Sequence, residues 1–346
     1  MRYASILFRH YRENGLFVAG AGENNGEFFL PFAKIRTLFL EHGIELNTPD
    51  VNAGRAVLFE LHINVQRRAP SRPGYVYLYE NALVRPRNED QRALQPYRKI
   101  FTWNTTLARE LGAARTQPSP RAVILPYPNR IETSPTPAFH DRPHGCVLVA
   151  SNKSLPIHDP RDLYQRRLQV VRAFESTVPA GFFSLYGRGW EYPAARPGKL
   201  GKLFASLRKR FKPPAQPPFP SWRGPIADKD ALLRQSKFAI CYENGADIPG
   251  YISEKIFDCF RAGCVPVYWG PQAIADDIPR DCFIDARAFP NEQALVVHVV
   301  SLGEKAHAAY QAAMVNFLCS PAAARFSEDH FAHTLVNEIT TDLRNH

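Results

Sequence analysis

No stretch of the sequence approaches about 18 consecutive uncharged apolar residues, the shortest run that crosses a bilayer as a helix. The apolar run near the first residue is also too short for a secretory signal. Internal repeats and low-complexity tracts are absent as well. We therefore expect a globular, cytoplasmic protein that is either soluble or peripheral on the inner face of a membrane.

Cysteine is scarce, and its spacing excludes the common zinc motifs. The six cysteines form no CxxC pair and no cluster with histidine at zinc-binding spacing. Most of them stand in apolar strand or helix contexts, so we expect them to be reduced and buried. Their positions are Cys146, Cys241, Cys259, Cys264, Cys282 and Cys319. The sequence accordingly predicts no metal site.

The chain is basic, with a formal net charge of +10, and one segment carries more than half of that excess. Residues 199–212 contain no acidic residue and six basic ones, Lys199, Lys202, Arg208, Lys209, Arg210 and Lys212. Such a surface meets anions, either phospholipid head groups or charged substrates. Nucleic acid is not the expected partner, because the charge is confined to one insertion and no recognition motif accompanies it.

The basic residues lie within a proline-rich insertion at residues 191–225. Leu200, Leu203, Phe204 and Leu207 follow helical spacing beside them, so the segment is both basic and amphipathic. This is the composition of a helix that lies on an anionic membrane surface. A solvated loop with a short basic helix explains the composition equally well.

The length of 346 residues predicts two domains, since a single core rarely grows beyond about 250–300 residues. Strand and helix signals alternate in both halves, which indicates two Rossmann-like α/β domains. Four prolines without periodicity mark a linker between them. The predicted parts are a first domain at residues 1–127, a linker at 128–144, a second domain at 145–325 and a final helix at 326–346.

Within these domains the pattern predicts individual elements. Strands are expected at residues 6–8, 56–61, 75–79, 99–102, 122–125, 146–150 and 182–186. Helices are expected at residues 162–175, 228–235, 291–302, 304–318 and 328–343, with an earlier one around Phe32 and Phe39 that ends at Gly43.

The most informative stretch is a strand–helix–strand unit in the second domain. A buried strand at residues 238–242 leads through a polar loop into a helix that opens with Glu254 and Lys255, and a second buried strand ends at Gly270. Its polar residues gather at one end of the sheet, where open α/β sheets bind ligands. The start of the helix also supplies free N–H groups suited to a phosphate. The unit therefore predicts a nucleotide-type ligand.

Glu254 and Lys255 are the first candidates for direct contact with that ligand. A lysine in the first turn of a helix is electrostatically unfavourable, and a bound anion would offset the cost. The neighbouring carboxylate is suited to the hydroxyl groups of a ribose. The alternative is an ordinary solvated helix start.

The run from Tyr242 to Gly270 resembles the signature of the family 10 glycosyltransferases, the α-1,3/α-1,4-fucosyltransferases, in a bacterial-type form. Ser253 stands where the family usually has threonine, which keeps the hydroxyl group. The resemblance implies an α/β GT-B fold, with two Rossmann-like domains facing an interdomain cleft. It also implies GDP-fucose as donor, inversion at the anomeric carbon, and no metal or other cofactor.

The resemblance also assigns donor-binding residues. Asn244, Tyr251, Glu254 and Lys255 match the family's donor-binding positions, with Glu254 on the ribose and Lys255 on the diphosphate. The segment Ser151-Asn152-Lys153, followed by Tyr164-Gln165-Arg166-Arg167, resembles an element whose arginine contacts the diphosphate. That role falls to Arg167, or to Arg166 if the register shifts by one residue.

Two further positions carry alternatives. Tyr186-Gly187-Arg188-Gly189 resembles a glycine turn of the family, where Arg188 holds phosphate or guanine, or else pairs with a surface carboxylate. Glu80 follows a predicted strand, and the resemblance makes it the catalytic base that deprotonates the acceptor. A surface ion pair is the other reading of Glu80.

Together these residues predict an inverting enzyme that moves fucose from GDP-fucose to a hydroxyl group of a glycan. The expected acceptor is a bacterial surface polysaccharide or a lipid-linked glycan precursor. A different nucleotide-sugar donor on the same fold, or a catalytically silent glycan-binding relative, are the alternatives.

Overall fold

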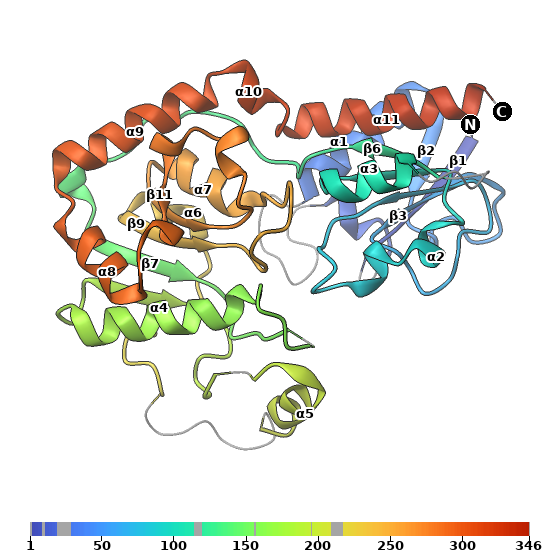
Figure 1. Ribbon diagram of the computed structural model, residues 1–346. Helices are drawn as coiled ribbons and strands as arrows, with labels where there is room; N and C mark the ends of the chain where they lie inside the picture. Colours follow the sequence, from blue (N-terminus) through green and yellow to red (C-terminus); the bar gives the residue numbers. More distant parts are fainter. Residues whose placement is uncertain are drawn as a thin grey trace. The chain divides into compact units, whose positions relative to one another are not determined.

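The computed structural model describes residues 2–8, 11–18, 29–113, 120–155, 157–194, 196–208 and 217–345. The chain divides into two compact α/β units (Figure 1). The first unit combines Met1–Arg130, Pro249–Tyr251 and Ala324–His346, and the second combines Ile131–Ile248 and Ile252–Ala323. The end of the chain therefore returns to the first unit.

The first unit is built on a parallel sheet of six strands in the order β2-β1-β3-β4-β5-β6. The strands are β1 (Arg2–Leu7), β2 (Ile44–Asn47), β3 (Val57–Ile63), β4 (Gly74–Tyr77), β5 (Lys99–Thr102) and β6 (Arg121–Ile124). Five of them overlap predicted strands. The sequence does not predict β2, because four residues of mixed polarity are too short for a periodic signal.

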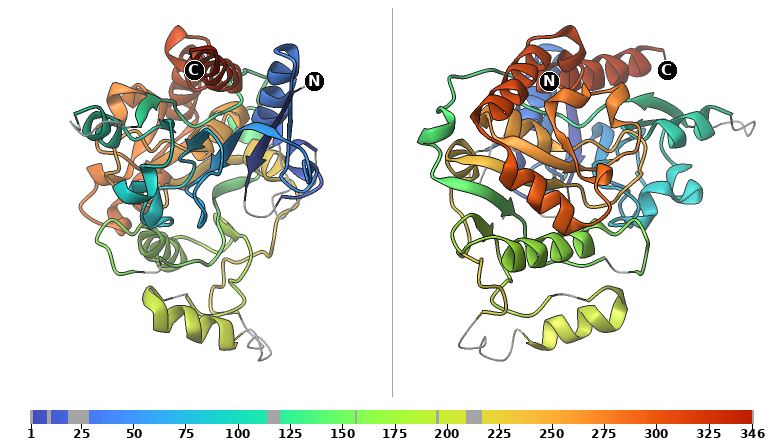
Figure 2. Two further views of the ribbon diagram at one scale, coloured as in Figure 1. Left: turned by 90° about the vertical axis from the view of Figure 1, so that its right-hand side faces the viewer. Right: turned by 60° about the vertical axis from the view of Figure 1, so that its left-hand side comes forward.

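Helices of the first unit include the last one in the chain. They are α1 (Leu30–Glu41), α2 (Gln91–Leu94), α3 (Thr105–Ala113) and α11 (Glu328–Arg344). Helix α11 packs along α1 (Figures 1 and 2). At its far end the Tyr75 hydroxyl donates to Asp342 at 2.6 Å, and the Lys99 ammonium pairs with Glu338 at 2.7 Å. Both contacts join α11 to the sheet.

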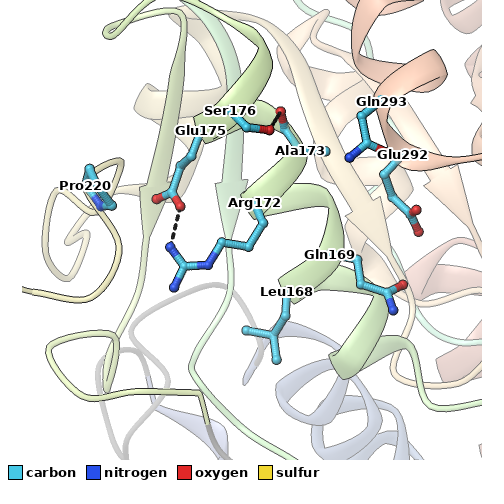
Figure 3. A pocket seen from close by; sticks show the side chains of 9 residues that line it. All are labelled: Leu168, Gln169, Arg172, Ala173, Glu175, Ser176, Pro220, Glu292 and Gln293. Carbon is cyan, nitrogen blue, oxygen red and sulfur yellow. Dashed lines mark hydrogen bonds and ion pairs between the residues drawn. The ribbon is translucent and has the colours of Figure 1, made fainter.

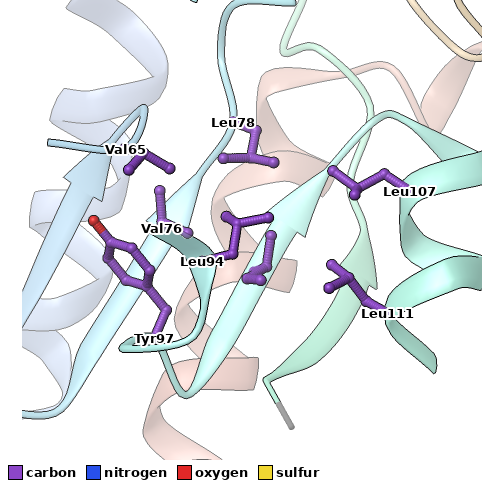
Figure 4. Packing of buried hydrophobic residues seen from close by; sticks show 8 residues of the cluster. Val65, Val76, Leu78, Leu94, Tyr97, Leu107 and Leu111 are labelled. Carbon is purple, nitrogen blue, oxygen red and sulfur yellow. The ribbon is translucent and has the colours of Figure 1, made fainter. Parts of the chain in front are cut away.

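Part of the core of this unit is shown in Figure 4. Side chains from β4, β5, α2 and α3 form one buried cluster, Val65, Val76, Leu78, Leu94, Tyr97, Ile100, Leu107 and Leu111. Two of these residues, Val65 and Leu78, follow the carboxyl ends of β3 and β4 rather than lying within a strand. The cluster therefore also packs the loops at that edge of the sheet.

The second unit has a parallel sheet of five strands in the order β11-β10-β9-β7-β8. The strands are β7 (His144–Val149), β8 (Phe183–Tyr186), β9 (Ser236–Tyr242), β10 (Val265–Trp269) and β11 (Ile284–Asp285). The chain leaves β7 toward β8 on one side and later returns to β9 on the other. The strand order therefore reverses between β7 and β9, and the carboxyl ends of the strands at such a reversal are the usual ligand position in open α/β sheets.

Helices cover both faces of this second sheet. The helices of the second unit are α4 (Leu163–Thr177), α5 (Gly198–Arg208), α6 (Lys229–Arg234), α7 (Glu254–Ala262), α8 (Glu292–Ser301), α9 (Glu304–Leu318) and, at the boundary of the units, α10 (Pro321–Ala324). Helices α4 and α8 pack together on one face, while α6, α7 and α9 lie on the other (Figure 1). All the helices predicted for this part of the chain are present within a few residues of their expected ends.

All six cysteines are free thiols, and five are buried. Cys319 is exposed, so the expectation of a buried thiol is wrong there. It directly follows the last residue of α9 and keeps a helical backbone, but it lies on the exposed side of that helix end, whereas Phe317 and Leu318 are buried. Within the described ranges, no helix combines the length and apolar character needed to cross a bilayer.

Candidate functional site

The carboxyl ends of β7 and β9 carry two loops that are bonded to each other. The backbone N–H of Ala246, after β9, donates to the carbonyl of Arg161, just before α4, at 2.8 Å. Asp162 caps α4 by accepting from the Tyr164 N–H at 2.8 Å. The start of α4 and the loop after β9 therefore form one connected surface at the strand-order reversal.

The buried side chain of Arg167, on α4, holds the loop after β9 in place. It is only 5% exposed, and its Nη2 donates to the carbonyls of Tyr242 and Glu243 at 2.6 and 2.8 Å and to Asn244 Oδ1 at 3.1 Å. These carbonyls end a strand and need such a partner, because a buried unpaired carbonyl is costly.

Arg166, the alternative to Arg167, lies elsewhere. Its guanidinium pairs with Glu292 at 2.9 Å and stands over the Trp269 ring at 5.1 Å. The structure thus brings Arg167, and not Arg166, to Asn244. Which arginine contacts a diphosphate stays a prediction.

Glu243 is the centre of the polar contacts beneath α7, and the sequence analysis does not single it out. Its side chain is fully buried. One carboxylate oxygen accepts from the Ser253 N–H at 2.8 Å and from the Tyr268 hydroxyl at 3.3 Å. The other accepts from the Ser253 hydroxyl at 2.7 Å and from the Lys255 ammonium at 2.9 Å. The signals in the sequence are its position directly after a buried strand and its place inside the run from Tyr242 to Gly270.

These contacts change the argument about Lys255. Burial by itself would lower the pKa of Lys255, but the carboxylates of Glu243 and Glu254 outweigh it and raise the pKa above its ordinary value. The carboxylate of Glu243 therefore offsets the unfavourable helix position, and a bound anion is not needed for that purpose. The Lys255 side chain as a whole is still 24% exposed.

Glu254 occupies the first position of α7 and is the more exposed carboxylate, with 44% of its side chain accessible. Burial would raise its pKa, but the charges of Lys255 and Lys229 prevail and hold the pKa below its ordinary value. Lys229 is itself held by Asp258 at 2.6 Å. Glu254 is therefore an ionised hydrogen-bond acceptor that solvent reaches.

The loops after β7 and β8 are joined by Asn152. Its backbone N–H donates to the Arg188 carbonyl and its side-chain amide to the Gly189 carbonyl, both at 2.9 Å. Gly187 has φ +132°, and a β-carbon there would lie 1.9 Å from the Ala150 carbonyl oxygen. This glycine is thus required by close backbone packing. The Arg188 side chain is exposed.

Tyr251 lies in the part of the loop that packs with the first unit. Its ring is buried, and its centroid is 4.7 Å from that of the Trp103 ring. Of the four motif residues, Asn244, Glu254 and Lys255 therefore belong to the second unit and Tyr251 to the first.

Glu80 lies in the first unit, three residues past the end of β4, so the strand is shorter than predicted. Its backbone is held by two buried asparagines: its N–H donates to Asn64 Oδ1 at 2.7 Å, and its carbonyl accepts from Asn88 Nδ2 at 2.6 Å. Asn88 also donates to Asn64 Oδ1 at 2.7 Å. The sequence analysis does not identify these two asparagines. They hold Glu80 in a fixed place, with its side chain half-buried.

A hollow of about 790 Å³ lies along α4, but it contains none of the candidate residues (Figure 3). It is lined by Leu168, Gln169, Arg172, Ala173, Glu175, Ser176, Pro220, Glu292 and Gln293. In it Arg172 pairs with Glu175 at 2.8 Å along the helix. It is set back from the first turn of α4, where the connected loops lie, and we do not assign the candidate site to it.

Comparison with known families places the motif. Residues 219–313 match the C-terminal part of glycosyltransferase family 10 (fucosyltransferase). The match includes β9, α7 and β10, with Glu243, Asn244, Tyr251, Glu254 and Lys255. It does not reach Glu80, Arg167 or Arg188.

Relatives with known activities match over short stretches. The α-(1,3)-fucosyltransferase FucT of Helicobacter pylori is 35% identical over 66 residues, which are 19% of this chain and 14% of that protein. An α-(1,4)-fucosyltransferase of Arabidopsis thaliana is 35% identical over 68 residues, 20% of this chain and 17% of that protein. The similarity thus spans less than a fifth of either relative.

The fold as a whole has a counterpart in a solved structure. HepE from Anabaena, in complex with UDP and glucose, is similar over 99% of this chain and 100% of that chain, with a TM-score of 0.54 and 11% identity. At this identity the likeness shows the fold alone. The predicted GT-B fold, with its two parallel α/β sheets, is confirmed.

Proposed function

We propose that the protein is an inverting fucosyltransferase that moves fucose from GDP-fucose to a hydroxyl group of a glycan. The observation that carries the proposal is the start of α7, where Glu243, Ser253 and Lys255 form one bonded group inside the segment matched by family 10. An oriented ammonium beside the N-terminus of a nine-residue helix suits a diphosphate.

Lys255 and the first N–H groups of α7 would bind the leaving GDP. Two of the three ammonium N–H donors of Lys255 go to Glu243 and Ser253, which orients the third. As the bond from the fucose anomeric carbon to the diphosphate breaks, negative charge develops on GDP, and these donors stabilise it without a metal. The exposed carboxylate of Glu254 would accept from the ribose hydroxyls.

Arg167 and Asn244 would complete the donor side. Because Arg167 is buried and bonded to Asn244, its first effect is to hold the loop after β9 in place. We propose that its remaining donors also contribute to binding of the diphosphate. Tyr251 and the exposed Arg188 would contact the donor at the edge of the site.

Glu80 would act as the general base. It would take the proton from the acceptor hydroxyl, the freed oxygen would attack the anomeric carbon from the face opposite GDP, and the bond to GDP would break with inversion. The two asparagines that hold its backbone support this role, since a base must stay within hydrogen-bond reach of its proton. The acceptor we propose is a bacterial surface polysaccharide or a lipid-linked precursor.

A donor panel tests the proposal. The purified protein would be titrated with GDP-fucose, GDP-mannose and UDP-glucose, with binding measured by calorimetry and hydrolysis by release of the nucleotide. We expect GDP-fucose to bind most tightly and to be the substrate, and Lys255→Ala to weaken its binding by about tenfold or more. Preference for another donor would replace fucose in the proposal.

A matched control separates charge at the site from charge in general. Lys237 is a lysine on the neighbouring β9 whose ammonium lies over the Phe139 ring at 4.2 Å, away from Glu243. Lys237→Ala should leave GDP-fucose binding unchanged. Equal losses in the two variants would contradict the assignment of Lys255 to the donor.

A further inference from the structure

Helix α5 exposes a row of large apolar side chains. Leu200 is 71% exposed, Leu203 54%, Phe204 60% and Leu207 42%. Their i, i+3, i+4, i+7 spacing places all four on one side of the helix. We call these four residues the α5 stripe. A contiguous apolar surface of this kind marks a site of interaction with a partner or a membrane.

The charge beside the α5 stripe has one sign. Residues 199–212 contain six basic residues and no acidic one, and of these Lys209, Arg210 and Lys212 lie outside the described residues. Apolar side chains together with Lys and Arg are the composition of helices that lie in the headgroup region of bilayers with anionic lipids. A second copy of the chain would bring two segments of the same strong positive charge together, which is unfavourable.

Both ends of the insertion are attached at the edge of the sheet that carries the candidate site. On the way into α5, the Ser154 hydroxyl donates to the Arg196 carbonyl at 2.8 Å, and the Gly198 N–H donates to the Leu155 carbonyl at 3.1 Å. On the way out, the Trp222 indole N–H donates to the Gly187 carbonyl at 2.9 Å.

The helix itself stands apart from α4 and from the sheet of its unit in both views of Figure 2. The loops that hold it follow β7 and β8. The α5 stripe is therefore attached at the same edge of the sheet as the loop between β9 and α7, although to different strands.

We propose that α5 docks the protein on a membrane surface that contains anionic lipids, with the α5 stripe in the headgroup region and the positive charge of residues 199–212 attracting the lipid phosphates. This goes beyond the proposed transfer reaction and does not depend on it. The docking surface sits on the unit that carries the donor motif, so an acceptor attached to lipid would be concentrated at that unit.

Vesicle sedimentation with the full chain tests the proposal. We expect binding to vesicles of phosphatidylcholine with about 30% phosphatidylglycerol, and at least roughly tenfold weaker binding to phosphatidylcholine alone. Raising the salt from about 0.1 M to about 1 M should weaken the binding, because the charge is screened. Absence of binding to the anionic vesicles would overturn the proposal.

Variants locate the surface. Leu203→Glu with Phe204→Glu should reduce binding to the anionic vesicles by about tenfold or more, since two apolar groups are replaced by negative charges. The matched control is Val297→Glu with Val300→Glu on α8, whose side chains are 58% and 43% exposed, and it should bind as the wild type does. Because both pairs are on the surface, both variants should keep the wild-type melting temperature.

Two outcomes would assign the α5 stripe differently and overturn the membrane proposal. If the Leu203/Phe204 variant turned a dimer into a monomer in light scattering while vesicle binding stayed absent, the stripe would cover a second copy. If it bound anionic vesicles as well as the wild type, the stripe would have no part in docking.

Discussion

At the scale of single residues, the site depends on one buried carboxylate. Glu243 holds the Ser253 N–H, the Ser253 hydroxyl and the Lys255 ammonium, so it orders the start of α7 and directs the lysine. Glu254, one position before Lys255, is more exposed and lies 4.0 Å from the Lys255 ammonium, farther than Glu243 at 2.9 Å. Substitutions of these two glutamates therefore distinguish two roles: Glu243 orders the start of α7, and Glu254 is the candidate for direct contact with the ligand.

Glu243→Gln should destabilise the fold by about 2 kcal/mol, less than the roughly 3–5 kcal/mol for a fully buried pair, because the Lys255 ammonium is partly hydrated. Glu254→Gln should change stability by no more than about 0.5 kcal/mol, yet weaken GDP-fucose binding. Urea unfolding and calorimetry measure the two effects. A stability loss in Glu254→Gln equal to that in Glu243→Gln would contradict the division of roles.

Glu80→Gln should lower the rate of transfer by about 10²–10⁴-fold, because the amide cannot take the proton from the acceptor. Binding of GDP-fucose, measured by calorimetry, should stay at the wild-type value. Glu110→Gln, an exposed glutamate on α3, serves as the control and should transfer normally. Full activity in Glu80→Gln would remove Glu80 as the base.

At the scale of elements, the edge of the second sheet is set by close backbone packing between strand-end loops. Gly187 and Gly181 flank β8, and both have positive φ, +132° and +101°. A β-carbon at Gly187 would meet the Ala150 backbone, whereas one at Gly181 would meet nothing within 4 Å. Both glycines have a φ angle that would be strained for any other residue. Only at Gly187 would an added β-carbon also clash with neighbouring backbone.

Gly187→Ala should destabilise the protein by about 2 kcal/mol or more beyond the loss in Gly181→Ala, since both variants carry backbone strain and only the first adds a clash. Thermal unfolding monitored by circular dichroism gives the difference. Equal melting temperatures for the two variants would show that the β7 and β8 loops can separate at no cost.

The packing of α9 against β9 predicts a dependence on pH. His307 is fully buried, with its Nε2 3.0 Å from the Lys237 carbonyl, and burial lowers its pKa to about 4. The unfolded chain, with a pKa near 6.5, takes up the proton first as the pH falls. The contribution of His307 to stability is therefore complete above about pH 6.5 and is lost progressively toward pH 4.

Between pH 7 and pH 5 the loss from this one group should be about 2 kcal/mol. His307→Gln keeps a donor for the Lys237 carbonyl but does not titrate, so its stability should fall less over the same range by that amount. Urea unfolding at both pH values measures the difference. Parallel curves for the wild type and the variant would contradict a neutral, buried imidazole.

At the scale of the whole molecule, the last helix of the chain, α11, packs into the first unit. Helix α11 buries Phe331, Leu335 and Ile339 in the first unit, and Asp342 accepts from Tyr75, 267 residues earlier in the chain. The first unit can therefore form fully only after the second unit and α11 have been synthesised.

Leu335→Ala should destabilise the first unit by about 2–5 kcal/mol, the usual cost of a cavity in a core. His333→Ala, on the exposed side of the same helix, should cost no more than about 0.5 kcal/mol. Hydrogen exchange should show faster exchange in β1 to β6 and unchanged protection in β7 to β10. Equal acceleration in both sheets would mean that the two units unfold together.

Local pattern accounts for much of this protein. Buried strands, capped helices and turn residues carry their signals within a few positions, so the two α/β units, most strands and the helix that opens with Glu254 and Lys255 can be predicted from the sequence. The short β2 is not predicted because four residues of mixed polarity carry no period. Helix α3 is also not predicted, although its buried Leu107 and Leu111 have helical spacing. No periodic pattern in the sequence predicts where the side chain of a residue that follows a strand will point.

Contacts between distant parts of the chain determine which partner each buried polar group has. Glu243 binds Lys255 twelve positions later, Arg167 holds Asn244 seventy-seven positions later, and α11 joins the first unit from the far end of the chain. Such contacts form only when distant elements are brought together, because the free energy of a buried charge depends on what surrounds it. The residue types of the candidate site are thus readable along the chain, whereas their contacts with one another exist only in the fold.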